Sequence, residues 1–262
     1  MIDQLHYLLA AFSGVLVGFT LGLVGGGGSV LAVPLMVYVV GVRDPHIAIG
    51  TSAFAVAVNA LASLWNHARS GNVNWRCGGT YAVAGVIGAL AGSTLGKAID
   101  GQKLLFLFAM LMLVVAMLMY RGRGDAGVEG AVCNRDNFPK VASFGFGTGT
   151  LSGFFGIGGG FLIVPGLVAS TSMPIYRAIG TSLVAVSAFG LTTALNYAAS
   201  GMLDWPLAGS FIAGGVAGSL LGTSASRRLS ARKGTLNAIF ATMVLIVACY
   251  MLYQSWAAIS AA

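Results

Sequence analysis

The stretch 18–34 reads GFTLGLVGGGGSVLAVP, so four consecutive glycines stand inside an otherwise apolar run. A second stretch, 149–165, reads GTLSGFFGIGGGFLIVP and repeats most of the same glycine, valine and proline positions. Glycine in a helix interior costs about 1 kcal/mol per residue relative to alanine, so each cluster predicts a break in a helix. These two breaks limit the folds that the chain can adopt.

The likeness between the two stretches extends along the whole chain. A shift of 131 residues superposes the two glycine stretches, and a shift of 130 superposes AIGTS at 48–52 on AIGTS at 178–182. The chain is therefore expected to consist of two copies of one unit. The first membrane repeat covers 1–120 and the second covers 141–262. Between them, 121–140 is a charged linker that is rich in glycine.

The charged residues indicate that these repeats lie in a membrane. Lys, Arg, Asp and Glu make up 8% of the 262 residues, against about 25% in ordinary soluble domains. Six uncharged runs have the length of one membrane span: 45–68, 77–96, 104–120, 178–203, 205–226 and 234–262. We therefore expect an all-α polytopic membrane protein. The composition disfavours a soluble enzyme and a nucleic-acid-binding domain, despite the net charge of +7.

Two further uncharged runs, 4–42 and 141–176, contain the glycine clusters and are too long for one helix. If each run crosses the membrane once, the repeats are parallel and the 14 Lys and Arg residues divide into eight and six between the two sides. If each run enters, breaks at its glycines and returns, the repeats are inverted and the same residues divide into eleven and three.

The division into eleven and three is a strong positive-inside bias, so we expect inverted repeats. Each repeat would have a glycine-broken segment, re-entrant or discontinuous, followed by three transmembrane helices. Both termini would then lie outside the cytoplasm.

Paired helix breaks inside a membrane predict a binding site. In lipid an unpaired backbone group costs several kcal/mol, so a break is tolerated only where it is buried in protein or lines a cavity. Breaks at corresponding positions of two repeats are typical of transporter sites near the membrane midplane. Each cluster precedes a half-helix, 29–40 or 160–169, and the free N–H groups at its positive end would favour an anion.

The expected site uses backbone N–H groups, hydroxyls and amides, without Lys or Arg. The candidate substrate-binding residues are Gly25, Gly26, Gly27, Gly28, Ser29, Thr51, Ser52, Asn66, Gly156, Gly158, Gly159, Gly160, Thr181, Ser182 and Asn196. Two alternatives stay open: the hydroxyls can bond back to helix carbonyls, and the asparagines can bridge helices. The regularly spaced glycines that precede each cluster are expected to serve helix packing.

No catalytic residue, metal site or cofactor is expected, because no Asp or Glu lies within a span and the three histidines are scattered. The three cysteines are far apart and form no CxxC motif, so neither a metal site nor a disulfide is expected. Cys77 and Cys249 are expected to be small buried apolar residues.

The doubled pattern of a glycine cluster, a proline and AIGTS resembles the sulfite exporter TauE/SafE family, also called the 4-toluene sulfonate uptake permease family. The resemblance covers the whole chain. It implies a bacterial or archaeal inner-membrane transporter of anions such as sulfite, sulfonates or sulfoacetate. By motif position it places the site at the two glycine clusters and the Thr-Ser pairs of AIGTS. Ile157 replaces a glycine of the first cluster, which predicts two unequal half-sites.

Energetics favour export. Moving one negative charge out of a negative cytoplasm releases about 2.3 kcal/mol per 100 mV, and the spans contain no carboxylate for a proton relay. The alternatives are proton-coupled anion uptake, in which His67 or His46 would have to serve, and a carrier of another small solute. The expected partners are a small anion and the lipid bilayer, without nucleic acid; the sequence leaves a homodimer open.

Overall fold

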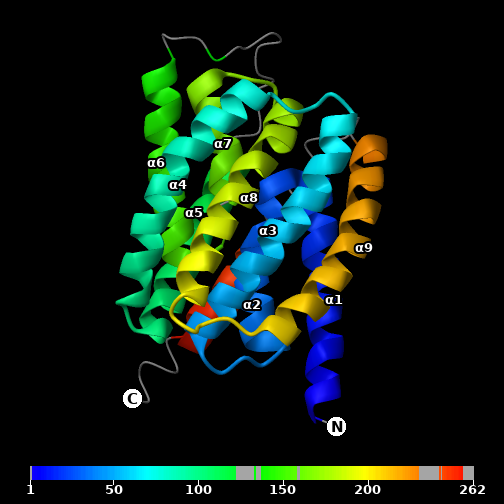
Figure 1. Cartoon of the computed structure of the whole chain (residues 1–262), viewed down its shortest axis with the longest axis vertical. Coiled ribbons are helices and arrows are strands. Elements are labelled where there is room, and N and C mark those ends of the chain that lie inside the picture. Colours follow the sequence, from blue (N-terminus) through cyan, green and yellow to red (C-terminus); the bar gives the residue numbers. More distant parts are fainter. Residues whose placement is uncertain are drawn as a thin grey trace.

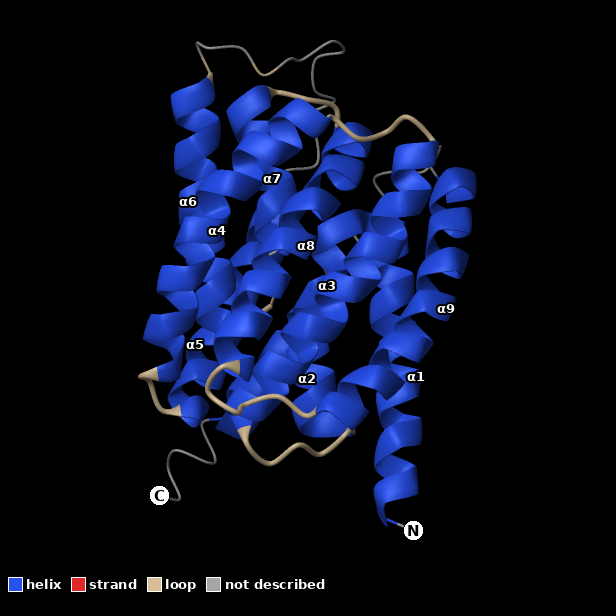
Figure 2. Ribbon diagram, viewed as in Figure 1, coloured by secondary structure: helices blue, strands red, loops and turns tan. Residues whose placement is uncertain are grey.

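The computed structural model describes residues 2–121, 133, 137–157, 160–229, 242 and 244–255. Every regular element among these residues is a helix (Figures 1 and 2). The main helices are α1 (Ile2–Val24), α3 (Pro45–Arg69), α4 (Trp75–Lys97), α5 (Gly101–Arg121), α6 (Phe138–Phe155), α7 (Gly160–Thr171), α8 (Ile175–Ala198) and α9 (Trp205–Leu229). Between α1 and α3 lie the short η1 (Gly25–Leu31), α2 (Ala32–Pro34) and η2 (Leu35–Val39). A further apolar helix covers Val244–Ser255.

Several helices have the length and composition of membrane spans. Within the described residues, five segments qualify: Gln4–Val39, Pro45–Arg69, Trp75–Lys97, Ile175–Ala198 and Trp205–Ala225. The outward-facing side chains are also apolar, and Leu8, Val83, Ile87, Leu221 and Ile246 are each more than 60% exposed. A soluble protein would not carry such a surface, whereas lipid tails would cover it. The expectation of an all-helical, multi-pass architecture agrees with this structure.

The helices run between two ends of a bundle, and Figure 1 shows which connections share an end. The start of α1 and the connections 40–44, 98–100 and 199–204 lie at the lower end in this view. The connections 70–74 and 172–174 lie at the upper end, as does the start of α6. The segment from α1 to η2 therefore begins and finishes at the lower end, and the α6–α7 segment begins and finishes at the upper end.

Two helix pairs pack with their backbones in contact. In α1, a Cβ on Gly18 would lie 1.9 Å from the carbonyl oxygen of Gly215 in α9. In α6, a Cβ on Gly149 would lie 2.1 Å from the carbonyl oxygen of Gly85 in α4. The contacts are reciprocal, because Gly149 corresponds to Gly18 and Gly85 corresponds to Gly215 in the repeat. These glycines allow close helix approach, as small residues at regular spacing commonly do in membranes.

The cysteines differ from the expectation. Cys77 and Cys133 form a disulfide, with their Cα atoms 5.4 Å apart, and Cys249 is exposed. The prediction of no disulfide was wrong because a separation of 56 residues has no local signature. The fold brings the two together because α4 and α6 pack side by side, with Cys77 in the first turn of α4 and Cys133 just before α6. The prediction of a buried Cys249 was also wrong, because the residue lies on the exposed face of the apolar helix Val244–Ser255.

Candidate functional site

Both glycine clusters begin at a residue with left-handed backbone. Gly25, which follows the end of α1, has φ +71°, and Gly156, the C-cap of α6, has φ +67°. Glycine adopts this conformation without the steric cost that a Cβ would add. Beyond this point the two segments differ, since the first continues as the tight helix η1 and α7 begins at Gly160. The predicted site residues Gly158 and Gly159 lie outside the described residues.

The two glycine clusters meet at Gly26 and Gly160. A Cβ on Gly26 would lie 2.5 Å from the Cα of Gly160, and a Cβ on Gly160 would lie 1.8 Å from the carbonyl oxygen of Gly26. A side chain at either position would have to displace the opposite backbone. All residues of η1, including Gly27, Gly28 and Ser29, are buried. The fold therefore brings the two clusters from distant parts of the sequence into one closed contact.

Each cluster also contacts the AIGTS segment of the opposite half. A Cβ on Gly25 would lie 2.8 Å from the carbonyl oxygen of Ile179, and one on Gly156 would lie 1.9 Å from Cγ2 of Ile49. The backbone N–H of Gly26 donates a hydrogen bond to the Ser182 hydroxyl at 3.3 Å. The predicted site residues of each half thus contact residues of the other half.

The serine hydroxyls bond to nearby carbonyl oxygens. Ser29 donates to the carbonyl of Gly26 at 2.9 Å, Ser52 to that of Ile49 at 3.1 Å, and Ser182 to that of Ile179 at 2.7 Å. A hydroxyl that donates in this way keeps lone pairs for accepting a further bond. Ser182 accepts such a bond from the backbone N–H of Gly26. All three serines are fully buried.

The two threonines of AIGTS hold connections between helices. Thr51 Oγ1 accepts a hydrogen bond from the backbone N–H of Asp204 at 3.0 Å. Thr181 Oγ1 accepts one from the backbone N–H of Asn74, also at 3.0 Å. Both threonines are fully buried. They fasten the 199–204 and 70–74 connections to the bundle at its opposite ends.

The two asparagines predicted for the site lie near the ends of α3 and α8. Asn196 bridges α8 to the end of α4: its Nδ2 donates to Ser93 at 2.6 Å, and its Oδ1 accepts from Lys97 Nζ at 2.8 Å. Asn66 occupies the corresponding turn of α3, where its carbonyl accepts from the Ser70 hydroxyl at 3.0 Å. Asn196 was predicted either to bind substrate or to bridge helices, and these hydrogen bonds are those of a residue that bridges helices.

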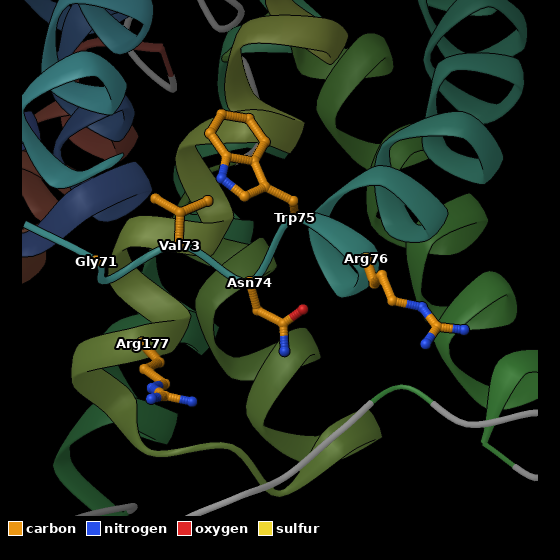
Figure 3. Close-up of a pocket in the computed structure, with 6 residues that line it drawn as sticks. All are labelled: Gly71, Val73, Asn74, Trp75, Arg76 and Arg177. Atoms are coloured by element: carbon orange, nitrogen blue, oxygen red, sulfur yellow. The ribbon is translucent and has the colours of Figure 1, made fainter. Parts of the chain in front are cut away.

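A cavity of about 340 Å³ opens beside the 70–74 connection. It is lined by Gly71, Val73, Asn74, Trp75, Arg76 and Arg177 (Figure 3). Figure 3 shows Asn74 between Arg177 from α8 and Arg76 from α4. In the sequence, these arginines indicated only the topology of the chain in the membrane. Arg177 comes directly before the second AIGTS segment, and this position could have indicated a place near the predicted site. In the structure, Thr181 of that segment accepts a bond from the backbone N–H of Asn74.

The described residues contain no group of three or more His, Cys, Asp or Glu side chains placed to hold a metal ion. The groups described above are backbone amides, hydroxyls and two arginines. Such groups donate hydrogen bonds and attract negative charge.

Comparison with known proteins agrees with a transport role. Residues 10–251 match the family described as Sulfite exporter TauE/SafE. A probable membrane transporter protein of Xylella fastidiosa (strain Temecula1) is 53% identical over 250 residues, which cover 95% of this chain and 96% of the relative. The probable membrane transporter protein YunE of Bacillus subtilis is 22% identical over 271 residues, 95% of this chain and 98% of the relative.

A relative from the archaeon Methanocaldococcus jannaschii, also named a probable membrane transporter protein, is 28% identical over 203 residues, 74% of each chain. No solved structure matches the chain. The family match spans nearly all of the helices described above, including both glycine clusters and both AIGTS segments. On these grounds the chain belongs to the sulfite exporter TauE/SafE family of membrane transporters.

Proposed function

We propose that this chain exports a small sulfur-containing anion, of the sulfite, sulfonate or sulfoacetate type, across a bacterial or archaeal cytoplasmic membrane. The observation that carries the proposal is the contact between Gly26 and Gly160, where helix breaks of both halves meet. α7 begins at Gly160, so its first N–H groups and the positive end of its dipole face this contact. An anion would bind there when the two breaks separate.

An inverted arrangement of the two repeats forms part of the proposal. It is supported by the reciprocal contacts of Gly18 with Gly215 and of Gly149 with Gly85. It is also supported by the opposite directions in which α1 and α6 enter the bundle (Figure 1). The positive-inside rule would place the end that carries Arg76 and Arg177 in the cytoplasm and both termini outside it. The disulfide of Cys77 at the same end favours the opposite orientation of the inverted repeats, because disulfides form in oxidising compartments.

Positive side chains at both ends of the bundle support an anion as cargo. Arg76 and Arg177 line the cavity at one end. At the other end, Lys97 is half-buried and donates to the Asn196 carbonyl at 3.0 Å and to the Ser200 hydroxyl at 2.8 Å. The sequence between these ends carries no formal charge within the spans. Cations at each mouth would concentrate anions without trapping them at the centre.

The second candidate function is proton-coupled anion uptake. It is favoured by one observation, the burial of His67 in α3, where only 2% of the residue is exposed. A histidine inside a span can change its protonation state near neutral pH and so couple proton and anion movement. In this case the cargo would move inward, against the membrane potential.

Reconstituted vesicles distinguish the two candidates. The purified chain is placed in proteoliposomes loaded with sulfite, sulfoacetate or taurine, and efflux is followed under an imposed potassium diffusion potential. Export driven by voltage predicts that an inside-negative potential accelerates efflux of sulfite or sulfoacetate. If voltage leaves the flux unchanged and a pH gradient drives it, the uptake candidate is correct instead. Liposomes that are loaded with the same anion but contain no protein measure the passive leak of the anion.

A further inference from the structure

Asn59, in the middle of α3, is a fully buried amide with unmet hydrogen-bonding capacity. Neither its Nδ2 nor its Oδ1 has a hydrogen-bond partner among the residues that the structure describes. The hydroxyl of Ser63, one helical turn further along α3, is likewise fully buried and unpartnered within that part of the chain. Such groups destabilise a folded protein, and more so in a membrane, where water does not reach them.

Asn59 lies at the junction of α1, α3 and α9. A Cβ on Gly215 of α9 would lie 1.9 Å from Asn59 Nδ2, so only glycine leaves room for the amide. Gly18 of α1 presses on Gly215 as well, since its Cβ would lie 1.9 Å from the Gly215 carbonyl oxygen. The amide therefore sits against bare backbone, between the helix that leads to the first glycine cluster and its packing partner.

The second repeat shows that the fold itself does not require a polar group here. Phe189 corresponds to Asn59, and Gly85 corresponds to Gly215. A Cβ on Gly85 would lie 1.9 Å from Cζ of Phe189, so the same glycine-walled space holds an aromatic ring. That ring stacks on Tyr81, with centroids 6.4 Å apart. An apolar side chain fills the space in one half, which leaves the asparagine in the other half without a packing explanation.

Asn59 also belongs to a buried polar stripe along α3. Asn59, Ser63 and His67 follow at intervals of four residues, which places them on one face of the helix, and all three are buried. Beyond His67 the chain enters the 70–74 connection, which lines the cavity with Arg76 and Arg177. In the other direction the same helix carries Ser52. The stripe runs between the AIGTS segment and the arginine-lined cavity.

We propose that Asn59 and Ser63 form an intermediate binding site for the transported oxyanion, between the glycine clusters and the cavity. This inference rests on the proposed function. The two N–H groups of the amide and the hydroxyl of Ser63 would donate to sulfite or sulfonate oxygens, and Oδ1 would accept from a water that accompanies the anion. The site exists in the first repeat only, because Phe189 fills the equivalent space of the second.

The test compares Asn59→Leu, Asn59→Ser and Ser63→Ala with Phe189→Leu, the matched change in the other repeat. Sulfite efflux from proteoliposomes is measured together with the thermal midpoint of each purified variant. Asn59→Leu is expected to lower sulfite efflux about tenfold, the loss expected for a hydrogen bond to a charged ligand. The same change should raise the thermal midpoint, because it removes an unsatisfied amide. Asn59→Ser keeps one donor and should retain part of the efflux, and Phe189→Leu should leave efflux unchanged.

Two outcomes overturn the site. In the first, Asn59→Leu transports sulfite like the original chain. In the second, Asn59→Leu loses thermal stability together with flux, and Asn59→Ser restores neither, which would make Asn59 a structural residue. If the unmodified chain moves neither sulfite nor sulfoacetate, the proposed function is wrong and the site is wrong with it. An active unmodified chain with an equally active Asn59→Leu variant overturns the site alone.

Discussion

The backbone N–H of Gly26 donates to the hydroxyl of Ser182, a residue 156 positions away in the opposite repeat. Ser182→Ala removes the acceptor and leaves a buried N–H unpaired, which costs about 1–3 kcal/mol. We expect a lower thermal midpoint and weaker anion binding, since the bond fixes the first glycine cluster against α8. Thermal shifts measured with and without sulfite check both effects.

Ser210→Ala is the control for this variant. The Ser210 hydroxyl donates to the Pro206 carbonyl at 3.3 Å on the exposed side of α9, so its loss should be nearly neutral. Equal thermal midpoints for the two variants would contradict the structural role of the bond between Gly26 and Ser182.

Gly160→Ala should abolish transport. The added methyl would lie 1.8 Å from the Gly26 carbonyl oxygen, so the two glycine clusters would have to move apart. Gly147→Ala in α6 is the matched control, because a Cβ there has nothing within 4 Å. Both changes add one methyl to a glycine within a helix, Gly160 at the start of α7 and Gly147 in the interior of α6. Sulfite efflux is compared between the two variants at equal protein content. Similar efflux from both would argue against a central role for the contact between Gly26 and Gly160.

Several features of this fold could be read from the sequence, for identifiable physical reasons. The ends of α1 and α6 follow from glycines that can adopt positive φ, namely Gly25 and Gly156. The helical, membrane-spanning character follows from uncharged runs of span length. The duplicated motif also indicated that the two AIGTS segments play equivalent parts, and the paired bonds of Thr51 and Thr181 agree with this equivalence.

Other features depend on contacts that a sequence pattern does not encode. The threonines of AIGTS were predicted as anion donors, and this stays a prediction; the sequence did not indicate that their Oγ1 atoms also accept bonds from connections that only the packed bundle brings close. The sequence did not indicate Asn59 as a site residue, because the repeat points to positions that the two halves share and this position differs between them. The disulfide of Cys77 with Cys133 depends on the packing of α4 beside α6, which neither cysteine's local sequence reveals.

Arg177→Gln should slow anion entry at the cavity. Arg177 lines this cavity together with Asn74 and Arg76, so removing its charge lowers the local anion concentration. We expect a several-fold lower rate at low ionic strength, with the difference shrinking toward physiological salt, where the Debye length is about 8 Å. The measurement is the initial rate of sulfite flux against salt concentration, with the cavity end facing the substrate.

Arg69→Gln is the control for charge at the same end of the bundle. Arg69 does not line the cavity, and its guanidinium stacks 4.7 Å from the centre of the Trp65 ring. If both variants slow sulfite entry equally, the effect comes from overall charge and the cavity has no special part in it.

The proposed inverted topology places Ser70 and Gly101 on opposite sides of the membrane. Ser70 follows α3 at the upper end in Figure 1, and Gly101 begins α5 at the lower end. In a background with all three native cysteines replaced, Ser70→Cys should react with a membrane-impermeant maleimide only after the cytoplasmic face is opened. Gln102→Cys, at the exposed position next to the buried Gly101, should react in intact cells, since this end of α5 would face outward. Labelling of both cysteines from the same side would contradict the proposed topology, and the reverse pattern would keep the inverted repeats but turn the arginine-rich end outward.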